Sequence, residues 1–172
     1  MSTILATTEE VLFKLPHRAV ILLRGCPGAG KSYFVDLLEK YLGSPHAPFE
    51  VVSADHYFVE KETGDYVFNK HLLGQAHAAC YENFEYFTSL HGDKRPLYII
   101  VDNTNTTMKE MEQYINRAKE MDLDVIAVTL LTNPFVAAAR NIHGVPQDRV
   151  IEMYNRLIKT ELPENITHYV VK

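Results

Sequence analysis

Short apolar runs alternate with longer amphipathic stretches along the chain. Five apolar runs are predicted as strands, at residues 19–23, 49–53, 97–101, 125–131 and 168–171. Apolar side chains at helical spacing predict helices over about residues 31–42, 69–90, 107–121, 134–142 and 146–159. Near-continuous apolar strands that alternate with helices are typical of a parallel sheet covered on both faces. The pattern therefore predicts an α/β fold with a five-stranded parallel sheet.

Polar side chains follow two of these strands at the point where each strand ends. Asp55 comes just after the strand at 49–53, and Asp102 follows the strand at 97–101 directly. In parallel sheets of this kind, ligands bind beyond the carboxyl ends of the strands. We therefore expect a functional site at this edge of the sheet.

A glycine-rich segment after the first predicted strand has the P-loop pattern G-x-x-x-x-G-K-[ST]. It consists of Gly25, Cys26, Pro27, Gly28, Ala29, Gly30, Lys31 and Ser32, and it opens a predicted helix. Glycines let backbone N–H groups converge on phosphate oxygens, and the helix N-terminus adds positive partial charge. We expect ATP to bind here with Mg²⁺, with Lys31 at the β- and γ-phosphates and Ser32 as a metal ligand. Cys26 has no neighbouring base in the sequence and is interpreted as a filler of a variable loop position.

Two carboxylates complete the expected reaction centre. Asp55 is a candidate general base for an attacking hydroxyl, the alternative being a loop or N-cap carboxylate. Asp102 is placed like a Walker B aspartate that binds Mg²⁺. Asn103, Thr104 and Asn105 offer donors and acceptors for sugar or phosphate oxygens. The same residues could also form a polar turn that caps the next helix, where Thr107 and Glu110 fit a capping box.

A small helical lid is predicted over about residues 134–149. Arg140 lies at the joint between its two helices, where an arginine can neutralise a transferring phosphoryl group. Arg149 is a weaker candidate for this role, since helix surfaces often carry arginines. Four aromatic residues precede the long helix, and they could stack on a nucleobase or pin a loop: Tyr57, Phe58, Tyr66 and Phe68.

Chain length, net charge and cysteine content indicate the domain organisation, the kinds of nucleic acid that could bind and the cellular location. The 172 residues amount to a single domain over 1–172, with a short N-terminal extension at 1–17. A formal net charge of −5 argues against extensive duplex binding but not against a short single-stranded end. Two cysteines, no signal peptide and no apolar run near 20 residues favour a cytoplasmic protein away from membranes, or a nuclear one if eukaryotic.

Four segments together resemble the kinase domain of phage-type 5′-hydroxyl polynucleotide kinases and their eukaryotic relatives. The segments are 25–32, 53–57, 102–105 and 140–146, and the likeness runs from about residue 20 to 157. The resemblance implies a P-loop NTPase fold in which Asp55 is the general base and Lys31 and Ser32 serve triphosphate and metal. It also implies that Asn103 and Asn105 contact the acceptor nucleotide and that Arg140 contacts phosphate from the lid.

The chain departs from the phage enzymes near the acceptor. Phe58 stands where those enzymes carry an arginine, and His143 stands in the lid where another basic residue is expected. The expected function is ATP-dependent phosphorylation of the 5′-hydroxyl end of RNA or DNA. A small-molecule kinase of the same fold, acting on a sugar, nucleoside or nucleotide-sugar, is the first alternative. A non-catalytic ATP-binding regulatory module is the second.

Overall fold

The computed structural model describes residues 3–44, 47–91 and 93–172. Its sheet has the strand order β1-β6-β5-β2-β4-β3, and every neighbouring pair is parallel. The strands are β1 (Ile4–Leu5), β2 (Arg18–Arg24), β3 (Phe49–Val52), β4 (Leu97–Asp102), β5 (Asp124–Leu130) and β6 (Thr167–Val171). The α/β class with a parallel sheet is confirmed. The described residues form six strands rather than the predicted five, because β1 adds an edge strand beside β6.

The five predicted helices connect the strands with shifted ends, and the described residues add a further helix, Thr8–Lys14, which the sequence analysis did not predict. The helices are α1 (Thr8–Lys14), α2 (Lys31–Leu42), α3 (Leu73–His91), α4 (Met108–Glu120), α5 (Pro134–Arg140) and α6 (Gln147–Lys159), with 3-10 turns η1 (Ala54–Phe58) and η2 (Lys70–Leu72). The expected capping box of α4 is wrong by one residue. The Glu110 carboxylate accepts from the backbone N–H of Thr106, 2.7 Å away, rather than from Thr107.

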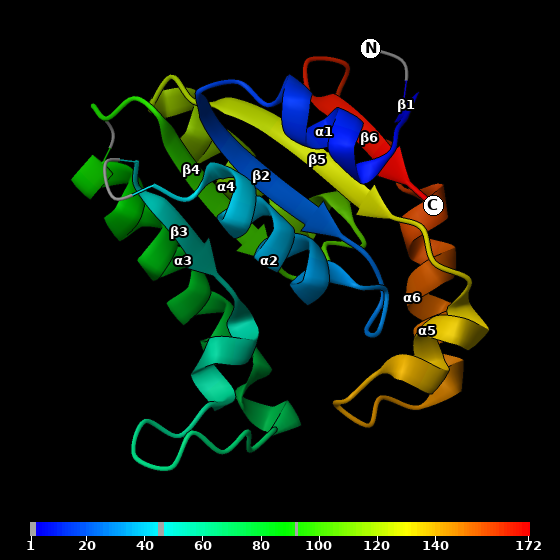
Figure 1. The fold of residues 1–172 in the computed structure, drawn as a ribbon. Coiled ribbons are helices and arrows are strands. Elements are labelled where there is room, and N and C mark those ends of the chain that lie inside the picture. The colour runs from blue at the N-terminus through cyan, green and yellow to red at the C-terminus, as the bar shows by residue number, and fades with distance from the viewer. Residues whose placement is uncertain (1–2, 45–46, 92) are drawn as a thin grey trace.

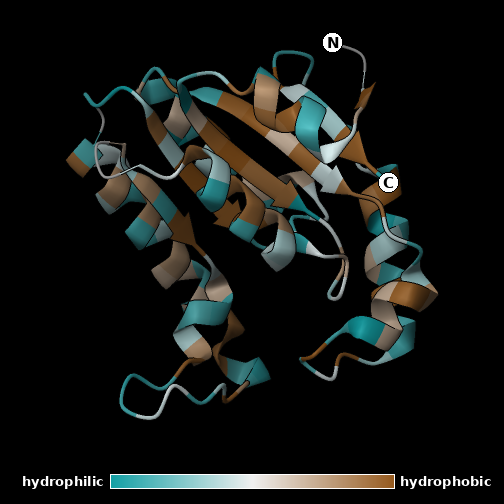
Figure 2. Ribbon diagram, in the orientation of Figure 1, coloured by the Kyte–Doolittle hydropathy of each residue, from teal (hydrophilic) through white to brown (hydrophobic). Residues whose placement is uncertain are grey.

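Two hydrophobic clusters cover the two faces of the sheet. Successive residues of β2 alternate between them: Val20 and Leu22 pack toward α3 and α4, whereas Ile21 and Leu23 pack toward α1 and α2. Figure 2 shows largely hydrophobic strands and helices that mix hydrophilic and hydrophobic residues. Burial on both faces explains why the central strands are continuous apolar runs.

The segment expected as an N-terminal extension packs against the sheet in its described part, residues 3–17. Ile4 and Leu5 pair with Tyr169 and Val170 of β6. Helix α1 then begins with a capping box between Thr7 and Glu10 and buries Val11 completely. Residues 1–2 of the expected extension lie outside the described residues.

Two lobes extend from the carboxyl edge of the sheet (Figure 1). One, the η lobe, comprises residues 54–72 with both 3-10 turns; the other contains α5 and α6 and includes the expected lid at 134–149. The P-loop connects β2 to α2 at this same edge. In the part of the chain that the structure describes, no helix combines the length and apolar character needed to cross a membrane.

Candidate active site

Neighbouring strands hold the P-loop by its backbone. The N–H of Gly25 donates to the carbonyl of Thr104, 3.0 Å away in the turn after β4. The hydroxyl of Thr132, just after β5, donates to the carbonyl of Ala29 at 3.0 Å. The strands on both sides of β2 therefore contribute to fixing the loop, as a phosphate-binding backbone requires.

The lid helices pack directly on the P-loop. Gly28 has φ +79°, and a Cβ at this position would overlap the Ala137 carbonyl of α5. The Cys26 thiol is buried and lies 3.6 Å from the Val150 carbonyl of α6. Burial raises the pKa of this thiol, so Cys26 is a packing residue, in agreement with its interpretation as a loop filler. The base of the lid and the phosphate loop form one packed unit.

Lys31 lies across the P-loop. Its Nζ donates to the carbonyls of Gly25 and Cys26 at 3.1 and 3.3 Å. Burial lowers the pKa of Lys31, while the charges of Asp102 and Asp55 act in the opposite direction. Within the described residues α2 has no side-chain cap, so its first N–H groups are available to phosphate oxygens.

Asp102 and Ser32 are the two side chains that the sequence proposes as ligands of Mg²⁺. Asp102 ends β4; burial raises the pKa of its carboxyl, and Lys31 lowers it. Ser32 is exposed in the first turn of α2. Mg²⁺ in kinases is held by one or two protein oxygens together with phosphates. One hydroxyl and one carboxylate therefore fit this metal without a larger cluster of ligands.

The turn that carries Asp55 is pinned to the sheet. The N–H of Ala54 donates to Asn103 Oδ1 at 2.9 Å, and the N–H of Asp55 donates to Ser53 Oγ at 3.2 Å. The Asp55 side chain itself is 55% exposed. A fixed backbone with an accessible carboxylate suits a group that must meet a substrate.

Two further side chains converge on Asp55. The Tyr66 hydroxyl donates to Asp55 Oδ1 at 3.0 Å, and His143 Nε2 lies 3.9 Å from Asp55 Oδ2. The rings of Tyr66 and His143 pack with centroids 4.5 Å apart. The sequence indicated both residues only as part of an aromatic set and as a lid position. Their meeting at Asp55 is a tertiary contact between three loops, for which the sequence carries no periodic signal.

The structure turns Asn103 and Asn105 inward rather than toward a ligand. Asn105 is buried with φ +46°, and its Nδ2 donates to the Leu23 carbonyl at 2.7 Å. Asn103 is also buried and supports the Asp55 turn. Thr104 is half-buried, and its carbonyl holds the P-loop. In this arrangement the side chains of Asn103 and Asn105 serve the turn, the alternative that the sequence left open, and their contact with an acceptor stays a prediction.

A buried arginine that the sequence analysis passed over lies under the P-loop. Arg24 is 1% exposed, and its guanidinium donates to the Asn105 carbonyl, the Thr129 hydroxyl and the Leu157 carbonyl. Burial lowers the pKa of Arg24 to about 10. Arg24 thus connects β2, β5 and α6 with the turn after β4. A charged residue closing an apolar strand directly before a P-loop was the available signal.

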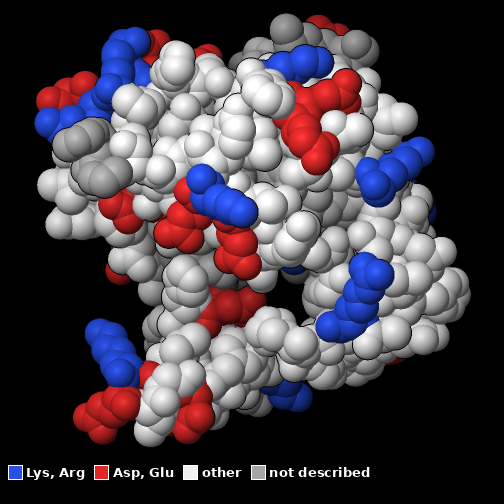
Figure 3. Space-filling view, in the orientation of Figure 1, with Lys and Arg blue, Asp and Glu red and all other residues white. Residues whose placement is uncertain are grey.

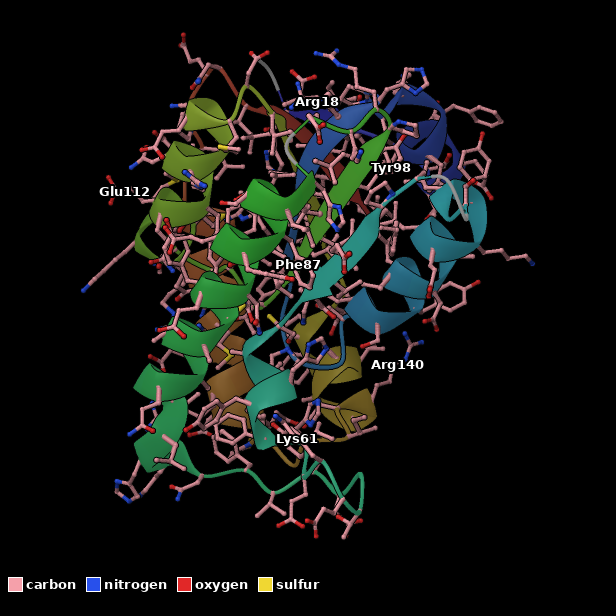
Figure 4. The ribbon with its side chains drawn as sticks, turned by 90° about the vertical axis from the view of Figure 1, so that its left-hand side faces the viewer. Arg18, Lys61, Phe87, Tyr98, Glu112 and Arg140 are labelled. Carbon is pink, nitrogen blue, oxygen red and sulfur yellow. The ribbon has the colours of Figure 1, made fainter. Side chains whose placement is uncertain are left out.

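Arg140 and the aromatic set occupy the two lobes. Arg140 is exposed in the last turn of α5, and Figure 4 shows it on the lid near the P-loop end of α2. Phe58 is buried against the rings of Tyr66 and Phe68, so it pins the η lobe. Tyr57 and Phe68 are 42% and 52% exposed. Pinning of the loop is thus observed for Phe58, whereas stacking of Tyr57 or Phe68 on a nucleobase stays a prediction.

The surface between the lobes is hollowed, and Figure 3 shows acidic atoms inside the hollow. Asp55 and Asp102 both act electrostatically on Lys31, which places two carboxylates and one ammonium near one another.

Arg149, the weaker lid candidate, is exposed and pairs with Glu152 at 2.8 Å. Within the described residues, no group of three or more His, Cys, Asp or Glu side chains could hold a metal.

Two solved structures, one of them a kinase, have a similar fold. The Pnkp1/Rnl/Hen1 RNA repair complex contains a chain that aligns with a TM-score of 0.61 at 16% identity, over 86% of this chain and 46% of that one. Mycobacterium tuberculosis APS kinase CysC, solved with AMPPNP and APS, aligns with a TM-score of 0.57 at 16% identity, over 90% of each chain. At this identity the likeness establishes the fold alone.

Curated relatives match at higher identity over a small part of their length. Human NEDD4-binding protein 2 is 32% identical over 154 residues, which cover 83% of this chain and 8% of that protein. Rat YLP motif-containing protein 1 is 30% identical over 145 residues, which cover 75% of this chain and 10% of that protein. The chain thus spans a tenth or less of the length of these relatives. A family model described as an AAA domain matches residues 20–150, from β2 to the first turns of α6, and the chain belongs to this family of P-loop proteins.

Proposed function

We propose that the chain is an ATP-dependent phosphotransferase that moves the γ-phosphate of ATP to a hydroxyl group. The acceptor in this proposal is the 5′-hydroxyl end of single-stranded RNA or DNA. The observation that carries the proposal is the placement of Asp55, whose accessible carboxylate is near enough to the P-loop for its charge to act on Lys31. A phosphotransferase benefits from a proton acceptor beside the transferred group, whereas a regulatory module that only binds ATP does not need one.

In the proposed reaction the acceptor oxygen attacks the γ-phosphorus of ATP. Its proton passes to Asp55 as the new O–P bond forms, and the bond from the γ-phosphorus to the β–γ bridging oxygen breaks. ADP leaves with the electron pair of that bond. Lys31 and Arg140 stabilise the charge on the phosphoryl oxygens. Ser32 and Asp102 are the proposed ligands of Mg²⁺, which when bound supplies positive charge to the phosphates.

Support for a nucleic-acid end as acceptor comes from motif order and from exposed aromatics. The four segments that resemble polynucleotide kinases occur in the same order and contribute to one edge of the sheet. Tyr57 and Phe68 are exposed on the η lobe, and exposed rings can stack on unpaired bases. A single-stranded end needs only such a local platform rather than a long basic surface.

The small-molecule alternative is favoured by two specific observations. Phe58 occupies the position at which the phage enzymes carry an arginine. It is buried and uncharged, so this position provides no positive charge to the acceptor. Besides Asp55, the η lobe carries three exposed acidic residues, Glu60, Glu62 and Asp65, which would repel a long phosphate backbone.

A transfer screen with ATP labelled at the γ-phosphate separates these possibilities. The candidate acceptors are 5′-hydroxyl RNA, 5′-hydroxyl DNA, nucleosides and sugars, with 5′-phosphorylated RNA of the same sequence as the blocked control. We expect label on the 5′-hydroxyl oligonucleotides and none on the blocked RNA. Label on a nucleoside or sugar alone would establish the alternative acceptor, and ATP binding without transfer to any hydroxyl would refute the phosphotransferase.

Binding of a labelled single-stranded oligonucleotide gives an independent measure. Contacts with phosphates release counterions, so affinity for a nucleic-acid acceptor falls as salt rises. A lack of binding at low salt would argue against a polynucleotide even if the chain transfers phosphate elsewhere.

A further inference from the structure

Three side chains from three separate segments meet beyond the P-loop: Asp55 of η1, Tyr66 of the following loop and His143 between α5 and α6. The Tyr66 hydroxyl lies 3.0 Å from Asp55 Oδ1, and His143 Nε2 lies 3.9 Å from Asp55 Oδ2. The two rings pack against each other at 4.5 Å. The η lobe and the lid therefore touch at the carboxylate that the proposed function uses as its base.

The two oxygens of Asp55 have different surroundings. Oδ1 accepts the Tyr66 hydroxyl. Burial and the Asp55 charge raise the pKa of Tyr66, so the phenol keeps its proton and remains a donor. Oδ2 faces His143 at a distance too long for a direct hydrogen bond. One oxygen is thus fixed in orientation, and the other is left for a further partner.

We infer that the acceptor hydroxyl binds between Asp55 Oδ2 and His143 Nε2, an inference that rests on the proposed function. A hydroxyl oxygen can lie about 2.8 Å from both atoms when these are 3.9 Å apart. In that position the hydroxyl donates its proton toward Asp55, and Nε2–H of His143 donates to the oxygen that attacks phosphorus. The side chains of Asp55 and His143 are 55% and 33% exposed, so the position is open to a substrate.

His143 is held for this role by the internal bonding of its loop. The Asn141 side chain donates to the carbonyls of Ala138 and Val145 at 2.8 and 3.1 Å and accepts the Val145 N–H at 2.8 Å. These bonds close the loop from both ends around His143 and Gly144, whose φ is +66°. The loop in turn continues α5, which packs on the P-loop at Gly28. The contact to the acceptor and the phosphate site are therefore carried by one packed frame.

Two different roles follow for the partners of Asp55. His143 contacts the acceptor hydroxyl itself and is a catalytic residue of the transfer. Tyr66 does not reach the acceptor; it is a positioning residue that orients the carboxylate through Oδ1 and supports the His143 ring. Removal of the His143 ring should weaken recognition of the acceptor, whereas removal of the Tyr66 hydroxyl should slow the transfer step after the acceptor has bound.

Steady-state kinetics of three variants test these roles, with 5′-hydroxyl single-stranded RNA as acceptor and, in parallel, with water as acceptor in ATP hydrolysis. For H143A we expect kcat/KM for RNA to fall about tenfold to a hundredfold with KM for ATP unchanged. H143Q keeps an N–H donor and should recover activity to within about threefold of the wild type. Y66F should lower kcat about tenfold and leave both KM values unchanged.

His77→Gln and Tyr86→Phe are matched controls, because both residues are exposed on α3 and remain outside the site. Both controls should retain wild-type kinetics, and all variants should keep the wild-type unfolding temperature. Equal loss in H143A and H143Q, or a loss expressed only in KM for ATP or in unfolding temperature, would mean a structural role and would overturn the inference.

Asp55→Asn distinguishes this inference from the proposed function. An inactive D55N beside fully active H143A and Y66F would remove His143 and Tyr66 and leave the proposed function intact. A fully active D55N would remove the general base and this inference together. Absence of turnover by the wild type with both RNA and water would have the same consequence.

Discussion

The two halves of the site are built in opposite ways. The P-loop half consists of backbone that neighbouring segments hold from several sides, through Thr104, Thr132, Ala137 and Val150. The Asp55 half depends on side chains that stand partly exposed on the η lobe and the lid. Substitutions in the first half should therefore act through folding, whereas those in the second should act through turnover.

Asp55→Asn tests the second half most severely. Loss of the proton acceptor should lower kcat by about 10²–10⁴-fold. The exposed side chain contributes little to packing, so the free energy of unfolding should change by less than about 0.5 kcal/mol. Kinetics and denaturant unfolding measure both, with Asp65→Asn, an exposed η-lobe acid, as the control. A parallel fall in stability would break the contrast between the halves.

Gly28→Ala tests the first half. A methyl group there overlaps the Ala137 carbonyl at a positive φ, and the expected loss in unfolding free energy is about 3 kcal/mol. Gly30 also has a positive φ, +96°, but open space around its Cβ position, so Gly30→Ala should lose only about 1 kcal/mol. Both are measured without ATP. Equal losses would show that φ alone, and not packing of the lid on the loop, sets the requirement at Gly28.

Mild acid should lower the stability of the fold through protonation of His168. Its Nε2 lies 2.8 Å from the Thr129 hydroxyl, which also accepts a hydrogen bond from the Arg24 guanidinium. Burial, with a smaller contribution from Arg24, lowers the pKa of His168 from 6.5 to about 4. Below pH 6.5 the unfolded chain takes up a proton that the folded chain does not. Stability therefore falls between pH 6.5 and 4, by about 1–2 kcal/mol after a discount for solvent screening of this partly exposed ring.

The matched variant is His168→Gln, which cannot titrate. Its unfolding free energy should lack this part of the pH dependence, while the remaining acid sensitivity of the chain stays. Identical pH profiles for the wild type and H168Q would mean that another group carries the loss.

The smallest expected effects lie on the exposed aromatics. Tyr57→Ser and Phe68→Ser should each weaken binding of single-stranded RNA by about 1–2 kcal/mol, roughly tenfold, through lost base stacking. KM for ATP should stay at its wild-type value. Stability should fall slightly, because both rings pack on Phe58. Tyr86→Ser, on α3, is the control for loss of an exposed ring. RNA affinity that is insensitive to Tyr57 and Phe68 would favour a small-molecule acceptor.

The sequence revealed what depends on local pattern. The P-loop, the central strands and the order of the helices follow from glycine spacing and apolar periodicity, and the structure confirms the resulting α/β fold. Strand β1 was not predicted, because a strand of two residues shows no periodicity and pairs only with the distant strand β6. Helix α5 ends at Arg140, before the predicted Ile142. The next residue, Asn141, uses its side-chain amide to donate to the carbonyls of Ala138 and Val145.

The chemistry at the strand ends was predicted less evenly. Asp55 and Asp102 could be placed at one edge because parallel strands end together. The direction of a side chain was not accessible in the same way: Asn103 and Asn105 looked equally suited to a ligand and to a turn. Only tertiary packing turns them inward and brings Tyr66 and His143 onto Asp55.

The position of β2 in the middle of the sheet has a consequence for the order of folding. Leu23, two residues before the P-loop, pairs with Asp102 on one side and Val128 on the other, and both partners come much later in the chain. Parallel pairing of such distant segments is slow, because the intervening loops must close first. A peptide containing only β2, the P-loop and α2 should therefore not hold phosphate. Recovery of ATP binding during refolding should report a late event, after β4 and β5 have joined the sheet.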